Sequence, residues 1–250
     1  MSQTPQTQRL DQLLVSRGIF ESRSRARDAI TRGTVSANGQ IVTKAGQVFP
    51  PDVPLAIDDP AKDYVSRAAL KLVAALDHFS LDPKGRDCLD VGASTGGFTE
   101  VLLERGAAHV TAIDVGHGQM HERIAGDPRV TNIEGLNARN LSEGDLGGRA
   151  IDFVVSDVSF ISLKLALPPA LKLVAQGAIC ALLVKPQFEA GREAIGKGGL
   201  LKDPESASEV AAELERWLSK DMGWKSFGLI PSPISGGDGN QEFLLAGQKA

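Results

Sequence analysis

Residues 90 to 100 read Asp90-Val91-Gly92-Ala93-Ser94-Thr95-Gly96-Gly97-Phe98-Thr99-Glu100, after the short apolar run Cys88-Leu89. We interpret this stretch as a strand, a glycine turn and the start of a helix over about 98–106. Glycines let the backbone approach a ligand closely, and a helix N-terminus presents unpaired N–H groups at the positive end of its dipole. The stretch therefore predicts a ligand-binding turn in an α/β fold.

The glycine spacing of this turn separates the candidate ligands. A dinucleotide fingerprint has Gly-x-Gly-x-x-Gly and a P-loop has a Lys, whereas this turn has Gly-x-x-x-Gly-Gly and no Lys. Asp90 at the strand end would repel a phosphate but suits an ammonium or sulfonium group. The next strand-like run ends at Asp114, a carboxylate suited to two ribose hydroxyls. An adenosyl group with a cationic amino-acid tail fits both acids, which predicts S-adenosylmethionine.

The chain beyond residue 66 alternates strand-like and helix-like segments. The strand-like runs lie near 88–91, 109–114, 129–134, 151–156 and 178–184. This alternation predicts a doubly wound sheet. Two last strands, Trp224–Ile230 and Glu242–Ala246, are joined by a loop, which predicts an antiparallel hairpin at the sheet edge. We also expect Ser66 to cap a helix over 67–79, and Asp203 with Pro204 to start another.

Residues 9–44 are basic, whereas the rest of the chain is acidic. They hold seven Arg and Lys against three Asp and Glu, which leaves 20 basic and 28 acidic residues elsewhere. Two helix-like segments that end in Gly, 9–18 and 22–33, precede the hairpin signal Asn38-Gly39. A basic N-terminal region, which we call the head, precedes an acidic remainder. This distribution of charge predicts a local surface that binds a polyanion.

The sequence argues against a secreted protein, a membrane-spanning protein and a metal-binding protein. The polar N-terminus lacks the apolar core of a signal peptide, and the most apolar segment, 165–184, is interrupted by Pro and Lys. We expect no membrane span. Cys88 and Cys180 lie in strand-like runs without metal-ligand spacing, which predicts buried free thiols, a reducing cytoplasm and no metal site.

Charged residues stand where an open parallel sheet binds its ligands, beyond the carboxyl ends of the strands. Asp157 and Lys185 each follow a strand-like run, and Glu242 opens the last one. Such residues are often only solvated, so each one alone is weak support for a site. Lys71 lies on the helix that enters this region.

The residues after the fourth strand limit the chemical class of the methyl acceptor. Enzymes that methylate amino groups commonly carry Asn/Asp-Pro-Pro-aromatic there, whereas this chain has Ser156-Asp157-Val158-Ser159-Phe160. Methylation of carbon 5 of a pyrimidine needs a Cys nucleophile, and neither Cys lies in a strand-end loop. A hydroxyl acceptor remains, and a ribose hydroxyl needs a base.

Several motifs resemble the TlyA family of rRNA 2′-O-methyltransferases, relatives of the FtsJ/RrmJ group, over nearly the whole chain. The head, with Ser-Arg-Ser-Arg-Ala at 22–26 and Gly-x-Val-x-x-Asn-Gly at 33–39, resembles the RNA-binding domain named after ribosomal protein S4. The other matching segments are 66–72, 90–100, 156–160, 183–189 and 232–242. One departure is Tyr64-Val65, where the family often has Trp before Val.

The resemblance implies a Rossmann-like class I methyltransferase with a mostly parallel seven-stranded sheet and a small N-terminal α+β domain. We place the RNA-binding domain at 1–60, a linker at 61–65 and the methyltransferase domain at 66–250. The expected acceptor is the 2′-hydroxyl of cytidine in ribosomal RNA, free or in ribosomal subunits. Two other hypotheses are a non-catalytic RNA-binding protein that kept the fold and a membrane-active haemolysin, the name that some relatives carry.

The resemblance also assigns site residues. The catalytic tetrad falls on Lys71, Asp157, Lys185 and Glu242. The expected cofactor contacts are Asp90, Gly92, Ala93, Ser94, Gly96, Gly97, Phe98, Asp114 and Asn137. The expected RNA contacts are Arg23, Arg25, Arg27, Arg32 and Arg67. Lys185 either takes the proton of the acceptor or steers the hydroxyl and stabilises its developing charge while water removes the proton.

Overall fold

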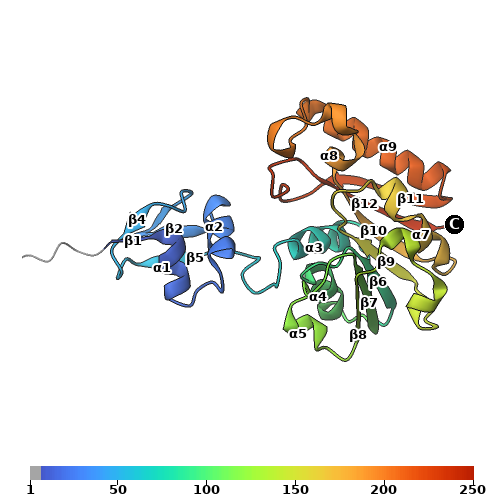
Figure 1. The fold of residues 1–250 in the computed structure, drawn as a ribbon, viewed down its shortest axis with the longest axis horizontal. Helices are drawn as coiled ribbons and strands as arrows, with labels where there is room; N and C mark the ends of the chain where they lie inside the picture. The colour runs from blue at the N-terminus through green and yellow to red at the C-terminus, as the bar shows by residue number, and fades with distance from the viewer. Residues whose placement is uncertain (1–6) are drawn as a thin grey trace, which may run out of the picture. The chain divides into compact units, whose positions relative to one another are not determined.

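The computed structural model describes residues 7–250 and divides the chain into two compact units, one that ends at Asp63 and one that begins at Tyr64 (Figure 1). The N-terminal unit packs its helices and short strands around one apolar core that includes Leu10, Leu14 and Ile30. Its elements are β1 (Gln8–Arg9), α1 (Leu10–Ser16), α2 (Arg23–Thr31), β2 (Val35–Ala37), β3 (Gln40–Ile41), β4 (Val48–Phe49) and β5 (Leu55–Ile57).

Local signals in the N-terminal unit act as expected. The Ser22 hydroxyl accepts a hydrogen bond from the N–H of Arg25 and so caps α2. Asn38 and Gly39 take φ values of 51° and 75° between the antiparallel strands β2 and β3. Positive φ at both central residues is what a two-residue hairpin with the right-handed strand twist requires. The hairpin prediction is therefore confirmed.

The C-terminal unit is built on a seven-stranded sheet with the order β11-β12-β10-β9-β6-β7-β8. Its strands are β6 (Asp87–Val91), β7 (His109–Asp114), β8 (Val130–Glu134), β9 (Phe153–Ser156), β10 (Ile179–Val184), β11 (Trp224–Pro231) and β12 (Phe243–Lys249). All neighbours pair in parallel except β12, which is antiparallel to both β10 and β11. The expected mostly parallel sheet with a hairpin at one edge is confirmed.

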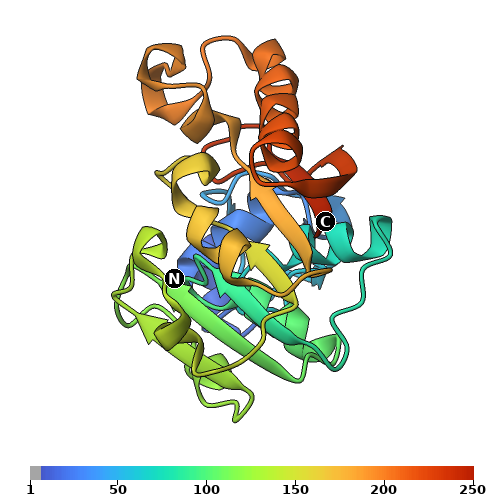
Figure 2. The ribbon, with the colours of Figure 1, turned by 90° about the vertical axis from the view of Figure 1, so that its right-hand side faces the viewer.

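Helices cover both faces of this sheet. They are α3 (Ala69–His78), α4 (Gly97–Glu104), α5 (Glu122–Ala125), α6 (Leu163–Ala166), α7 (Pro168–Leu173), α8 (Pro186–Glu189) and α9 (Ala207–Lys220). Five 3₁₀ turns also occur in the described chain: Ala138–Asn140, Glu143–Leu146, Arg192–Ala194, Lys197–Gly199 and Pro204–Ser206. Figure 2 shows α9 beside the strands of the C-terminal hairpin.

The strand β10 shows how the sheet makes two cores. Leu182 packs with α6, α7 and α9 on one face, while Leu183 packs with α3 and α4 on the other. Successive side chains of a strand point to opposite faces, so a strand covered on both sides is apolar at every position. This explains why the sequence of β10 is a continuous apolar run rather than an alternating one.

The start of α3 differs from the expectation. The Ser66 hydroxyl accepts a hydrogen bond from the N–H of Ala68 at 3.2 Å, but the helix begins only at Ala69. Ser66 therefore closes a turn before the helix instead of capping the helix itself. Asp203, in contrast, accepts from the N–H of Glu205 and starts the 3₁₀ turn that leads into α9.

The strand order reverses direction beside β6. The chain passes from β6 outward to β7 and β8, then returns to β9 on the other side of β6. In open α/β sheets, ligands bind at such a switch point beyond the carboxyl ends of the strands. Within residues 7–250, no helix has the length and apolar character that a membrane crossing requires.

Candidate active site

The glycine turn lies at the switch point, between the end of β6 and the start of α4. Gly92 has φ of +84°, and a Cβ there would lie 3.0 Å from the backbone nitrogen of Val158. Gly96 has φ of +92° as the residue that caps α4. Glycine is required at both positions because other residues rarely adopt this backbone and Gly92 has no space for a side chain. The turn therefore leaves its backbone exposed to a ligand.

A cavity of about 540 Å³ opens beside this turn, and we call it the glycine-turn cavity. Its size is that of a small-molecule site. The expected cofactor contacts Gly92, Ser94, Asp114 and Asn137 line it. It is further lined by Ile113, Val115, Gly116, Gln119, Leu136, Ala138, Asp157, Val158, Ser159, Phe160, Ile161 and Ala166.

Two acids lie at the glycine turn, Asp114 in the cavity wall and Asp90 behind the turn. Asp114 accepts N–H groups from Ser94 at 2.8 Å and Gly116 at 2.7 Å, which fixes its carboxylate at the cavity wall. Asp90 is fully buried behind the turn, where its Oδ2 accepts from the hydroxyl of Thr99 at 2.7 Å. Its Oδ1 has no hydrogen-bond partner among the described residues.

The environment of Asp90 disfavours its charged form. Burial raises the pKa of Asp90 to about 7, with a smaller contribution from the nearby Asp157 and partial opposition from Thr99. A buried carboxyl with an unused oxygen lacks a positive partner. A cationic ligand would supply one, so the donor set fits the ammonium of an amino-acid tail.

Five expected cofactor contacts do not line the cavity, namely the buried Asp90 and four further residues. Phe98 lies in the core against α3, because its position on α4 faces the sheet. Ala93 and Gly96 pack toward Ile124, and Gly97 lies against Ser66. These residues support the turn from behind.

One wall of the cavity depends on Glu134, a residue that no sequence motif singled out. Its carboxylate accepts the N–H groups of Gly118, Gln119 and Met120. These backbone hydrogen bonds lower the pKa of Glu134. Because Gln119 lines the cavity, Glu134 holds the loop that forms this wall. Its position at the end of β8, in register with Asp114, is a signal that the strand pattern already contained.

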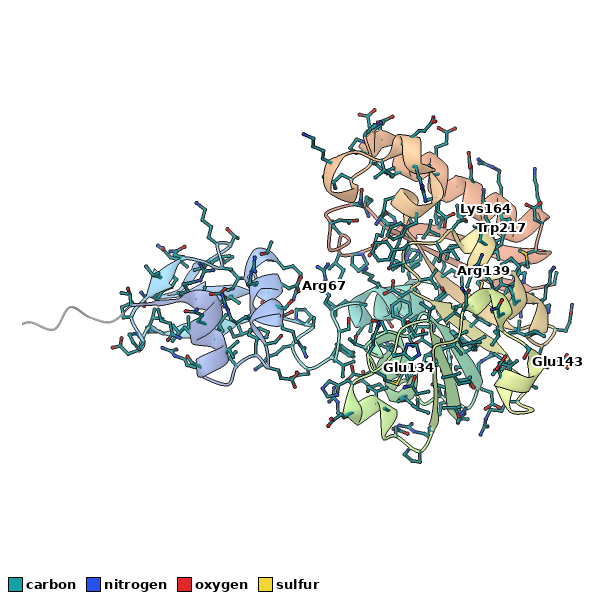
Figure 3. The ribbon with its side chains drawn as sticks, viewed as in Figure 1. Arg67, Glu134, Arg139, Glu143, Lys164 and Trp217 are labelled. Carbon is teal, nitrogen blue, oxygen red and sulfur yellow. The ribbon has the colours of Figure 1, made fainter. Side chains whose placement is uncertain are left out.

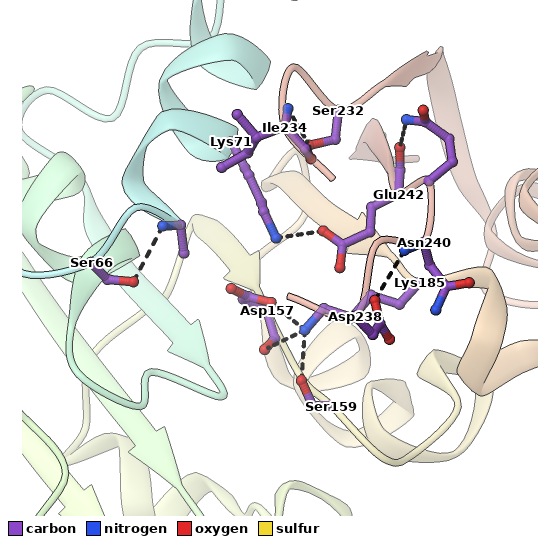
Figure 4. A network of polar contacts seen from close by, with 12 residues as sticks. Ser66, Lys71, Asp157, Ser159, Lys185, Ser232, Ile234, Asp238, Asn240 and Glu242 are labelled. Atoms are coloured by element: carbon purple, nitrogen blue, oxygen red, sulfur yellow. Dashed lines mark hydrogen bonds and ion pairs between the residues drawn. The ribbon is translucent and has the colours of Figure 1, made fainter. Parts of the chain in front are cut away.

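The four expected catalytic residues come together as two ion pairs (Figure 4). Lys71 on α3 pairs with Glu242, the residue before β12, and both side chains are buried. Lys185 at the end of β10 pairs with Asp157, with 2.6 Å between Nζ and Oδ1. Lys185 is 8% exposed. Lys71 and Glu242 are 171 positions apart in the chain. The fold thus brings together residues that are distant in the sequence.

A second cavity of about 790 Å³ opens at these ion pairs, and we call it the lysine cavity. Lys71, Lys185 and Glu242 line it. It is also lined by Ser159, Phe160, Gln187, Phe188, Arg192, Ile195, Gly198, Gly199, Gly237 and Asp238. Ser159 and Phe160 line both cavities, so the two spaces meet at these residues.

Phe160 is an exposed aromatic residue at this junction. It is 90% exposed and has φ of +64°, a backbone conformation that costs free energy in a bulky residue. Its ring lies 5.1 Å from that of Phe188, centroid to centroid. Exposed apolar surface at a cavity mouth is typical of a ligand contact. The sequence offered only the motif Ser-Asp-Val-Ser-Phe as its signal.

The five arginines expected to contact RNA differ in their surroundings. Arg32 donates to Asp28 and Asp59, and Arg25 donates to the backbone oxygens of Ala61 and Lys62. These contacts lie inside the N-terminal unit and support its structure. Arg23 pairs with Asp11, a fully buried carboxylate that also binds Arg9.

Two arginines are placed differently from these. Arg27 is exposed on α2. Arg67 precedes α3 in the C-terminal unit, with its guanidinium 3.6 Å from where a Cβ on Gly237 would lie (Figure 3).

Within residues 7–250, no cluster of His, Cys, Asp or Glu has an arrangement that would hold a metal ion.

Comparisons with known proteins agree with this geometry. Residues 64–249 match the family described as FtsJ-like methyltransferase, and residues 8–52 match the S4 domain. The chain is 45% identical to the 16S/23S rRNA (cytidine-2′-O)-methyltransferase TlyA of Mycobacterium tuberculosis, over 95% of this chain and 88% of that one. It is 39% identical to hemolysin A of Brachyspira hyodysenteriae, over 94% and 98%.

A solved structure from Streptococcus thermophilus is 38% identical to the chain and has a TM-score of 0.76. The alignment covers 99% of this chain and 90% of that one. The sheet order, the glycine turn and the paired charges thus stand in a chain whose C-terminal unit matches one family throughout. This protein belongs to the FtsJ-like methyltransferase family and carries an N-terminal S4 domain.

Proposed function

We propose that the protein transfers a methyl group from S-adenosylmethionine to the 2′-hydroxyl of cytidine in ribosomal RNA. Family membership supports the use of this methyl donor, and the S4 domain supports an RNA substrate. The observation that carries the proposal is the meeting of two cavities beside Lys185, in a chain whose relative from M. tuberculosis bears the name of this activity. Ribosomal RNA as substrate would place the protein in the cytoplasm.

The glycine-turn cavity is the proposed cofactor site. Asp114 is suited to the ribose hydroxyls, Asn137 to the adenine end and Asp90 to the amino-acid ammonium. When bound, S-adenosylmethionine supplies a sulfonium methyl, whose C–S electron pair stays on sulfur as the new C–O bond forms. The residues of the chain therefore have to bind, orient and deprotonate rather than form a covalent intermediate.

The lysine cavity is the proposed acceptor site. We assign Lys185 as the group that takes the proton of the 2′-hydroxyl, because its Nζ lies where the two cavities meet. Asp157 orients Lys185 through their ion pair, while Lys71 and Glu242 neutralise each other at the opposite wall. A positioned general base contributes about 10²- to 10⁴-fold to a rate.

Phe160 is the proposed platform for the acceptor nucleoside. A base displaced from its helix needs a surface on which to stack, and stacking on an aromatic side chain is worth about 1–3 kcal/mol per base. Phe160 presents a ring that is 90% exposed at the mouth of both cavities. In the neighbouring loop, Arg192 lines the lysine cavity and is suited to an RNA phosphate.

The decisive experiment uses ribosomal subunits from a strain that lacks this activity. The subunits are incubated with the protein and labelled S-adenosylmethionine, the RNA is digested, and 2′-O-methylcytidine is sought by mass. Product with the wild type and none with Lys185→Ala would support the proposal and show which subunit is read. Absence of product on both subunits despite tight cofactor binding would mean that the acceptor is wrong. Absence of cofactor binding would favour a protein that kept the fold to bind RNA.

A further inference from the structure

Ser159 contacts the proposed base directly. It follows the carboxyl end of β9 and lines both the glycine-turn cavity and the lysine cavity. Its hydroxyl oxygen accepts a hydrogen bond from Lys185 Nζ at 2.7 Å (Figure 4). Ser156, the other serine of the same motif, is fully buried in β9 and its hydroxyl has no partner in the described chain. The two serines therefore have different tasks, and Ser159 is the one at the reaction centre.

Lys185 Nζ is held from two sides. Besides Ser159, it lies 2.6 Å from Asp157 Oδ1, whereas the backbone oxygen of Asp157 is more distant at 3.5 Å. Nζ donates hydrogen bonds to the Ser159 hydroxyl and, at the greater distance, to the backbone oxygen of Asp157, whereas the Asp157 carboxylate attracts it as an ion pair without hydrogen-bond geometry. The bond to Ser159 is the shorter of the two hydrogen bonds and therefore sets the direction of Nζ.

A single ion pair does not fix a lysine in this surrounding. The side chain has a flexible four-carbon stem and an ammonium that any nearby carboxylate attracts. Two further carboxylates, Glu242 and Asp238, line the same cavity. The Ser159 hydroxyl holds Nζ on the Asp157 side, at the junction with the glycine-turn cavity. It thereby keeps this pair apart from the ion pair of Lys71 and Glu242.

The bond to Ser159 is also compatible with a change in the protonation of Lys185. An ammonium has three N–H donors, and a neutral amine keeps two of them together with one lone pair. Nζ can therefore donate to the Ser159 hydroxyl before and after Lys185 takes a proton, while the lone pair of the neutral amine faces the acceptor. The geometry is thus preserved through the proton transfer.

We propose that Ser159 is a positioning residue, which directs Lys185 Nζ toward the acceptor hydroxyl at the junction of the two cavities. The inference rests on the proposed function of Lys185 and adds one positioning residue to the four proposed catalytic residues. Because Ser159 acts through Lys185, its loss should lower the rate of the chemical step and leave the binding of both substrates unchanged.

The test compares Ser159→Ala, Ser159→Thr and the matched control Ser208→Ala. Ser208 is exposed on α9, and its hydroxyl bonds only a backbone oxygen. Each full-length variant is assayed on ribosomal subunits for kcat and for KM of RNA and of S-adenosylmethionine, and its melting temperature is measured. We expect kcat to fall about 10- to 100-fold in Ser159→Ala, since small misplacements of a catalytic group have effects of this size. Both KM values, the melting temperature and the control should not change.

Rescue by Ser159→Thr, which keeps the hydroxyl, would support the proposal because a role in packing alone would not be restored this way. A kcat of Ser159→Ala within twofold of the wild type would overturn it. A rise in KM for S-adenosylmethionine at unchanged kcat would overturn it too, since Ser159 would then be a cofactor contact. Absence of 2′-O-methylcytidine with the wild type is seen before any variant is compared. That result would overturn the proposed function itself and the role of Ser159 with it.

Discussion

The glycine-turn cavity and the lysine cavity lie side by side but are built by different means. The first is shaped by backbone, with a turn that excludes a Cβ at Gly92 and a loop held by its N–H groups on Glu134. The second is lined by the charged side chains of Lys71 on α3, Lys185 after β10 and Glu242 before β12. A site built from backbone selects a ligand by shape and has little room for added side-chain atoms. A site built from charged side chains selects a ligand by charge. Substitutions should therefore damage binding in the first cavity and turnover in the second.

Lys185→Ala should have the largest effect and make the contrast clearest. We expect turnover to be abolished, a loss of at least about 100-fold, because the proposed proton acceptor is removed. The affinity for S-adenosylmethionine should stay within a few-fold, as measured by calorimetry. Loss of cofactor binding would contradict the separation of the two cavities. Lys172→Ala serves as the control, because Lys172 is exposed on α7.

Gly92→Ala should damage binding rather than chemistry. A Cβ at this position would meet the backbone of Val158 at 3.0 Å, and the residue needs a φ of +84°. Strain of about 1–3 kcal/mol is typical of such a backbone. We expect the Kd for S-adenosylmethionine to rise at least tenfold in calorimetry.

Gly177→Ala is the matched control for this substitution. Gly177 also has a positive φ, of +78°, but a Cβ there would meet nothing within 4 Å, and it precedes β10 at the opposite end of the strand from Lys185. Its replacement should lower the melting temperature without changing the Kd. Equal effects of the two alanines on cofactor affinity would show that Gly92 acts only through stability.

The pH dependence of cofactor binding should report on Asp90. With a pKa of about 7, its carboxyl is mostly protonated below neutral pH in the free protein. A cationic ligand favours the carboxylate, so binding releases a proton and affinity rises with pH. We expect the Kd to increase by up to about tenfold as the pH falls from 8 to 6.

Calorimetry in two buffers of different ionisation enthalpy measures the released protons. The cofactor has an amine that also titrates, so the comparison is with Asp90→Asn, in which the part due to Asp90 should disappear. Identical proton release in the two proteins would show that Asp90 does not change its protonation on binding.

Glu134→Gln should have the smallest effect, again on binding alone. An amide accepts hydrogen bonds less strongly than a carboxylate, so the loop at 118–120 loosens without being lost. We expect the Kd for S-adenosylmethionine to rise about 3- to 10-fold and kcat at saturation to stay constant. Glu143→Gln is the control, because Glu143 is exposed and lies well away from Glu134 (Figure 3). A fall in kcat without a change in Kd would contradict the role given to Glu134.

Much of the architecture was predictable from local patterns. Apolar runs such as that of β10, the glycines of the turn and the Asn38-Gly39 hairpin each depend on a few consecutive residues. Their conformations follow from side-chain periodicity and backbone sterics, which the sequence states directly. The helix start at Ala69 rather than 67 was not predictable in this way, because a Ser can close a turn as readily as cap a helix.

The sequence by itself determined the sheet, the glycine turn and, through family resemblance, the four charged residues at strand and helix ends. Only the tertiary structure decided that Lys71 pairs with Glu242 and Lys185 with Asp157, that Ser159 accepts from Lys185, and that Glu134 binds the loop beside the glycine-turn cavity. It also showed that Phe98 lies in the core and that Arg32 is engaged by two carboxylates. The physical reason is range: a turn is determined by neighbours in the chain, whereas a contact between distant residues depends on how every intervening element packs.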